Sequence, residues 1–131
     1  MKRIILAALA AFVLIPATVA AAPPVASGTI SGPNEAAPYA FGDEITFTVT
    51  TDNLKGNQYP LVYVACYSVV DGELLYGQLA APDEVFVLGG GSSEWHTDRD
   101  DATCTADVRV YGGKNDQGQN VLDSVAFEAA G

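Results

Sequence analysis

Two runs of sequence decide the fold of this chain: Leu61-Val-Tyr-Val-Ala-Cys66-Tyr67-Ser-Val-Val70 and Thr103-Cys104-Thr-Ala-Asp-Val-Arg-Val-Tyr111. Each run holds one of the chain's two cysteines. In the first run Val62 and Val64 lie on the side of Cys66, and Tyr63, Ala65 and Tyr67 lie on the other. In the second run apolar residues lie on the side of Cys104, and polar residues with Tyr111 lie on the other. This period of two predicts a pair of β-strands, each with one buried face. We therefore expect both cysteines to point inward and the tyrosines of the same strands to point outward.

The start of the chain has the pattern of a secretory signal peptide. Lys2 and Arg3 precede an unbroken apolar run at 4–15, which ends at Pro16, and small residues follow at 17–22. Basic, apolar and small residues in this order indicate a cleavable leader. The apolar run is too short to span a bilayer, which takes about 20 residues.

We expect cleavage near Ala20 or Ala21, so that 1–21 is the leader and 22–131 is one domain with a flexible start at 22–26. The mature protein is then secreted and extracellular, with no insertion into a membrane.

The two cysteines of an exported chain indicate one disulfide. Cys66 and Cys104 lie 38 positions apart, and closing a loop of that size stabilises a domain by about 4 kcal/mol. Bridging two paired strands requires a Cα separation of roughly 4.4–6.8 Å. A metal site is the alternative, but neither cysteine has a second cysteine or a histidine at ligand spacing.

The charge of the chain excludes some partners. The net charge is −10, and it becomes −12 once Lys2 and Arg3 are removed with the leader. Nucleic acid and anionic membrane surfaces are therefore not expected as partners, because binding to them depends on basic patches. The acidity is explained by solubility outside the cell, with an acidic surface for a cationic partner as the alternative.

The mature sequence predicts an antiparallel β-sandwich of about seven strands and no amphipathic helix. Asp71-Gly72 is a hairpin signal, and Val121, Val125 and Phe127 are expected on one face of the last strand. The predicted strands are 27–31, 44–50, 61–70, 73–78, 84–88, 103–111 and 120–128.

This strand order resembles an immunoglobulin-like domain, in which the seven ranges are strands A, B, C, C′, E, F and G. Antibody-type domains differ, because their disulfide ties B to F and their tryptophan lies on C. The stretch Leu88-Gly-Gly-Gly-Ser-Ser-Glu-Trp95, followed by Cys104-Thr-Ala-Asp107, is similar to small exported immunoglobulin-like proteins of actinobacteria and their phages. That group has no assigned activity, so the resemblance implies a fold and leaves the function open.

The sequence predicts no catalytic site. Ser92 or Ser93 with His96 and Asp98 has the residue types of a hydrolase triad. Triad members normally converge from separate elements that hold them rigidly, whereas these residues lie within a short glycine-rich segment. We therefore expect a protein that is not an enzyme and that has no cofactor.

Several acidic residues raise the question of calcium. Asp98, Asp100 and Asp101 could gather oxygen ligands together with Asp52 or Asp83. Calcium needs six to eight oxygen ligands, and this run does not match the known calcium-binding loop. A solvated charged loop is the favoured interpretation, no metal site is predicted, and a weak calcium site stays open.

A binding surface is the most informative candidate site. Tyrosine and arginine are enriched where proteins bind partners, although tyrosines also occur as ordinary sheet surface. Trp95 is expected to cover one end of the sandwich, with ligand stacking as the alternative. The candidate partner-binding face consists of Tyr63, Tyr67, Tyr76, Arg109 and Tyr111.

The resulting hypothesis is a secreted, non-catalytic module that binds another protein through the exposed face of one sheet. The alternative is a carbohydrate-binding module that stacks sugars on exposed aromatic residues: Tyr63, Tyr67, Tyr76 or Trp95. The protein is expected to be a monomer, or a weak dimer formed through edge strands. The sequence identifies neither the partner nor the host.

Overall fold

The computed structural model describes residues 16, 24–91, 93–96, 98, 100–114 and 116–131. Within these ranges the chain forms strands and no helix, so the all-β prediction is confirmed. It follows that the described ranges contain no helix of membrane-spanning length and hydropathy. The predicted leader at 1–21 lies outside them except for Pro16. The strands are β1 (Ser27–Ser31), β2 (Tyr39–Ala40), β3 (Glu44–Ile45), β4 (Thr48–Asp52), β5 (Gln58–Ser68), β6 (Leu74–Ala80), β7 (Phe86–Val87), β8 (Ala102–Gly112) and β9 (Asp116–Ala130).

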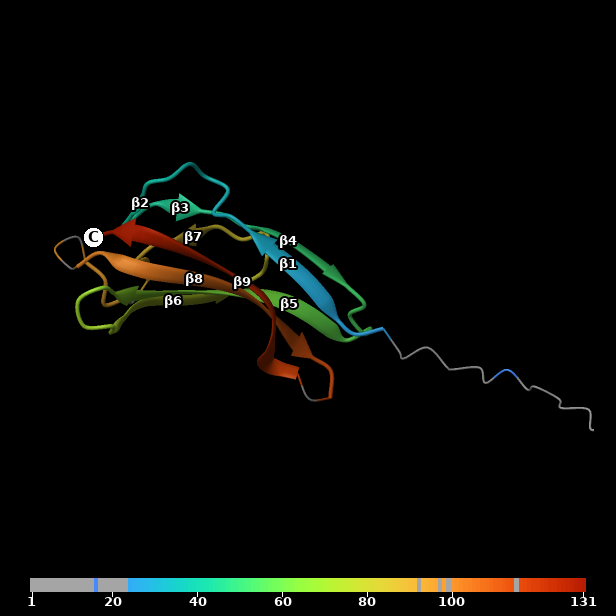
Figure 1. Ribbon diagram of the computed structural model, residues 1–131. Helices are drawn as coiled ribbons and strands as arrows, with labels where there is room; N and C mark the ends of the chain where they lie inside the picture. The colour runs from blue at the N-terminus through green and yellow to red at the C-terminus, as the bar shows by residue number, and fades with distance from the viewer. Residues whose placement is uncertain (1–15, 17–23, 92, 97, 99, 115) are drawn as a thin grey trace, which may run out of the picture.

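The strands form one large sheet and two small ones (Figure 1). The large sheet has the order β2-β9-β8-β5-β6, and all its neighbours are antiparallel except β2 and β9, which run parallel. The small sheets are the pairs β1–β4 and β3–β7. Each of the seven predicted strand ranges overlaps a strand, whereas the short β2 falls outside all of them.

The pairing of β5 with β8 is continuous over both strands, from Gln58 opposite Gly112 to Ser68 opposite Ala102. Cys66 lies directly opposite Cys104, and the two form the predicted disulfide. Their Cα atoms are 4.0 Å apart, somewhat closer than expected and near the spacing of a non-hydrogen-bonded antiparallel pair. Both cysteines are fully buried, so their inward orientation is confirmed.

The core lies between the large sheet and the two small sheets. Ile30, Ile45 and Phe86 enter it from the small sheets, while the valines and cysteines of β5 and β8 enter it from the large one. The Phe47 ring joins the two layers, because its centroid lies 5.8 Å from that of Phe86 and 6.1 Å from that of Phe127 in β9. Side chains from both layers therefore form one sandwich-like core.

The strand expected at 44–50 is divided into β3 and β4. The backbone of Thr46, at the division, bonds to a loop: its N–H donates to the Glu35 carboxylate (2.8 Å), and its carbonyl accepts from the Asn34 N–H (2.9 Å). The Thr46 hydroxyl also donates to Glu35 (2.6 Å). Because these groups are taken by the loop, β3 pairs with β7 and β4 pairs with β1.

Strand β9 contains a bulge that changes which residues face the core. Val108 pairs with Asp123, whereas the next residue, Arg109, pairs with Val121. The extra residue between them is Leu122, which packs against the core. The prediction that Val121 shares the inner face is therefore wrong: Val121 is exposed, because a bulge shifts the alternation by one residue.

The hairpin predicted at Asp71-Gly72 is confirmed, but its connection is longer than the two residues expected from that signal, since β5 ends at Ser68 and β6 begins at Leu74. The turn connects β5 to β6, with Gly72 at a φ of +72°, a conformation that glycine adopts without steric cost. The Ser68 N–H donates to the Glu73 carbonyl (2.9 Å), and the Gly72 N–H donates to the Ser68 carbonyl (2.9 Å).

Removal of the disulfide should destabilise the domain without altering its fold. For a bridge that spans 38 positions, the Cys66→Ala/Cys104→Ala variant should lose about 4 kcal/mol of unfolding free energy, because its unfolded chain is no longer constrained. Guanidinium unfolding measures the loss. A reductant should lower the stability of the native protein and leave the variant unchanged. A loss below about 1 kcal/mol would contradict this role.

Glu35 should make the stability depend on pH. Burial opposes ionisation of this carboxyl, but the hydrogen bonds from Thr46 prevail and lower the pKa of Glu35 below its ordinary value. A lowered folded-state pKa contributes stability above the unfolded-state pKa, and this contribution disappears as the pH falls through the folded-state pKa. Glu35→Ala should therefore cost about 1 kcal/mol at neutral pH, a value limited by solvent screening. In urea unfolding the difference should shrink toward pH 3, and a constant difference would contradict it.

Candidate binding face

The outer face of the large sheet carries four of the five residues expected there. Tyr63 and Tyr67 project from β5, and Arg109 and Tyr111 project from β8. The register places Tyr63 opposite Asp107, Tyr67 opposite Thr103, and Arg109 opposite Leu61. We call this surface the tyrosine face, and we define it by Tyr59, Tyr63, Tyr67, Arg109 and Tyr111.

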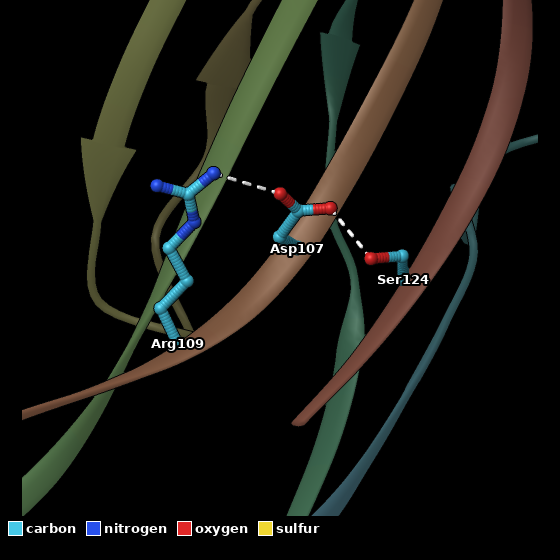
Figure 2. A network of polar contacts seen from close by, with 3 residues as sticks. All are labelled: Asp107, Arg109 and Ser124. Atoms are coloured by element: carbon cyan, nitrogen blue, oxygen red, sulfur yellow. Dashed lines mark hydrogen bonds and ion pairs between the residues drawn. The ribbon is translucent and has the colours of Figure 1, made fainter. Parts of the chain in front are cut away.

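A polar network crosses the centre of the tyrosine face (Figure 2). The Arg109 guanidinium forms an ion pair with Asp107 (2.9 Å), and the Ser124 hydroxyl of β9 donates to the other oxygen of Asp107 (2.6 Å). The hydrogen bond with Asp107 raises the pKa of Arg109, so this side chain stays charged. The same guanidinium lies 4.6 Å from the centroid of the Tyr63 ring, which is cation–π geometry. Three neighbouring strands are thereby tied together on one surface.

Two tyrosines of the face lie over glycines of neighbouring strands. A Cβ on Gly77 of β6 would come within 2.9 Å of the Tyr63 hydroxyl. A Cβ on Gly118 of β9 would come within 2.3 Å of the Tyr111 hydroxyl. Aromatic rings that cover sheet glycines stabilise the sheet. Tyr63 and Tyr111 therefore have structural roles, and both are only partly exposed.

Tyr59 was missed by the sequence prediction, which began the strand at Leu61. In the structure β5 begins at Gln58, and Tyr59 pairs with Tyr111. The two rings stack with their centroids 6.1 Å apart and their planes at 23°. Spacing could have identified Tyr59, because it lies four positions before Tyr63 and so on the same side of a strand. Tyr59 and Tyr67 are the open tyrosines of the face, 51% and 41% exposed.

Tyr76 does not belong to the face, and its predicted position is wrong. It lies opposite Cys66, so its side chain points inward with the cysteines, and it is only 3% exposed. Its hydroxyl donates to the Gln78 side chain, and burial raises the pKa of Tyr76 to about 12. An irregularity between Cys66 and Tyr67 brings Tyr67 opposite Leu74, so counting along β6 could not place Tyr76.

Trp95 is a core residue, as the favoured interpretation expected. It is 1% exposed, and its ring packs edge-on against Phe41, with centroids 5.8 Å apart. Its backbone N–H donates to the Ser93 hydroxyl (2.9 Å). The alternative role of Trp95 in stacking a ligand is wrong, because the core covers the ring.

Among the described residues with triad chemistry, Ser93 has a structural contact. The Ser93 hydroxyl donates to the Leu75 carbonyl of β6 (2.8 Å), so it fastens the loop to the sheet. His96 and Asp98 are both exposed. Ser92 lies outside the described residues.

Two of the candidate calcium ligands form hydrogen bonds with different partners. Asp100 accepts from the Ser68 hydroxyl (3.3 Å), and Asp101 accepts from the Gly131 N–H (3.0 Å). Among the residues that the structure describes, no three histidine, cysteine or acidic side chains come together in a group that could hold a metal ion.

Comparison with known proteins gives no match to this chain among family models, curated proteins or solved structures. Any role of the tyrosine face is therefore proposed from its own contacts, exposure and charge.

The contact between Tyr63 and Arg109 should be measurable by a double-mutant cycle of Tyr63→Leu and Arg109→Met. Both substitutions keep apolar bulk and remove the cation–π pair, so the coupling energy should be about 0.5–1 kcal/mol. Urea unfolding of the two single variants and the double variant gives this value. A cycle of Tyr63→Leu with Val121→Ala serves as the control, and equal coupling in both cycles would contradict a specific contact.

Proposed function

We propose that this chain is a secreted, non-catalytic, immunoglobulin-like module that binds another protein through the tyrosine face. The observation that carries the proposal is that exposed tyrosine rings and an arginine fixed by its contacts lie on the same surface. Tyr59 and Tyr67 present open rings, while Arg109 is held by Asp107 and Tyr63. A rigid surface loses little entropy on binding, and tyrosine and arginine contribute much of the energy at protein interfaces.

The strand order supports the immunoglobulin-like part of the proposal. The neighbours β9-β8-β5-β6 correspond to G, F, C and C′ in the resemblance. Strands β1, β3 with β4, and β7 correspond to A, B and E, and they form the smaller sheets that pack on the other side of the core. The disulfide joins C to F within one sheet, which distinguishes this module from antibody-type domains.

The covalent chemistry supports export. The bond between Cys66 and Cys104 is buried, and such bonds form and persist chiefly in oxidising compartments. The basic, apolar and small residues of 1–22 supply a matching leader pattern.

A protein partner is favoured over a glycan. Two of the four aromatic residues in the glycan alternative, Tyr76 and Trp95, lie in the core. The ring of a third, Tyr63, already has the Arg109 guanidinium against it. Of these four aromatic residues, Tyr67 alone is left for stacking on a sugar. A protein partner, by contrast, can bury Tyr67 together with Tyr59 and Arg109.

Replacement of the open tyrosines tests the proposal. The tagged mature domain should capture a partner from its native extracellular medium, and the dissociation constant is then measured with the purified partner. Tyr59→Ala and Tyr67→Ala should each weaken binding by tenfold or more, because truncated hot-spot residues cost about 2 kcal/mol. Tyr67→Ala should keep its unfolding midpoint, because Tyr67 is largely solvent-accessible at the surface of β5. Tyr59→Ala also removes the ring that stacks on Tyr111 and lies beside Gly112, so its midpoint should fall slightly, and its binding is measured well below that midpoint.

Val70→Ala is the matched control, since Val70 is exposed in the β5–β6 turn and lies away from the face. The proposal fails if both tyrosine variants bind as well as the native domain does. If the native domain binds specific sugars on a glycan array and Tyr67→Ala abolishes that binding, the face binds sugars instead.

A further inference from the structure

The edge of the large sheet at β6 is open in a way that sheet edges usually are not. Strand β6 is the last in the order β2-β9-β8-β5-β6, and its outer side has no strand partner among the described residues. Proteins usually block such an edge with charged residues or proline. The sequence of β6, Leu-Leu-Tyr-Gly-Gln-Leu-Ala, contains neither. The Leu75 carbonyl accepts a hydrogen bond from the Ser93 hydroxyl. Beyond it, β6 has no strand partner on its outer side among the described residues, so this part of the edge can pair with another extended chain.

A groove of about 530 Å³ lies beside this edge, between β6 and the segment that contains β7. Its walls include Val85 and Val87, which are 47% and 37% exposed, and Gly90 and Gly91 leave part of it without side chains. The volume is in the range of sites that bind ligands. The described lining residues are Leu74, Leu75, Tyr76, Gly77, Gln78, Val85, Val87, Gly90, Gly91, Ser93 and Glu94.

We propose that β6 and this groove bind an extended segment of another polypeptide, which adds to the large sheet as a further strand. Its backbone pairs with β6, and apolar side chains at alternate positions enter the groove, because side chains of a strand point to the two faces in turn. This site is separate from the tyrosine face, and it does not depend on what that face binds.

The negative charge of the groove and of the chain indicates which residues should flank the apolar positions of the bound segment. The described residues that line the groove include one carboxylate, Glu94, and no basic side chain, and the whole chain carries a net charge of −10. A segment with lysine or arginine beside its apolar positions is therefore attracted, whereas an acidic one is repelled.

A second copy of this chain does not fit the site. The β6 strand of a second copy could pair with the edge, but its own inward side chains, Leu75 and Tyr76, are buried in its core and cannot enter the groove. Two acidic copies also repel each other. The occupant is accordingly a different chain with free side chains on both faces.

The first test uses the purified mature protein and a labelled synthetic peptide, Lys-Val-Thr-Val-Thr-Val-Lys, with blocked ends. Fluorescence anisotropy should detect saturable binding. Three matched peptides should each bind at least tenfold more weakly: one with serine for valine, one with glutamate for lysine, and one with methylated backbone nitrogens at alternate positions. No binding of the parent peptide at millimolar concentration, or equal binding of the serine peptide, overturns the proposal.

The second test places the site on the protein. Val85→Asp puts a charge in the groove wall and should weaken peptide binding at least tenfold. Val121→Asp is the matched control, because Val121 is similarly exposed, at 43%, but lies opposite Arg109 on the other face of the large sheet, and it should leave peptide binding unchanged. Glu94→Gln should weaken the lysine peptide and not its uncharged threonine analogue. Thermal unfolding checks that each variant is folded.

The opposite pattern, with loss only in Val121→Asp, assigns the peptide to the tyrosine face and overturns the proposal. Analytical ultracentrifugation tests for a second copy in the groove. If the native protein self-associates and Val85→Asp abolishes this, the groove binds a second copy and the proposal is overturned.

Discussion

The pairing of β5 with β8, closed by the disulfide between Cys66 and Cys104, is the constraint on which the rest of the structure depends. It is continuous along both strands, so it determines on which side of the large sheet each side chain of β5 and β8 lies. The inner side receives the cysteines and valines that form the core with the small sheets. The outer side receives the tyrosines and Arg109. The register of β5 with β8 thus places residues both in the core and on the candidate binding surface.

Sequence alone predicted those parts that depend on alternation within an unbroken strand pair. The disulfide and the outward positions of Tyr63 and Tyr67 follow from counting by two along β5. Counting failed where strands are irregular: the bulge in β9 turned Val121 outward, and the irregular pairing of β5 with β6 left Tyr76 inward. Bulges depend on partner strands, which a single run of residues does not reveal. The division at Thr46 likewise results from a distant loop.

The residues of the candidate site differ in how much of each ring is taken up by contacts within the sheet. Tyr63 and Tyr111 cover glycines and contact neighbours, so their presence has a structural explanation. Tyr59 and Tyr67 are more exposed, although Tyr59 also stacks on Tyr111. Residue type and alternation identified four of the five residues of the tyrosine face before the structure did, but they could not separate these roles. Whether a ring has a structural role depends on which neighbouring strand it lies over, and the pairing of strands in the sheet determines this.

The burial of Trp95 has a practical consequence. It is the single tryptophan of the chain, and its indole is enclosed beside Phe41, with a ring nitrogen that makes no hydrogen bond in the described structure. Its neighbours Ser93 and Glu94 line the groove next to β6. The native emission of this one indole therefore reports, without any attached dye, both on whether the layers stay closed and on events at the groove wall.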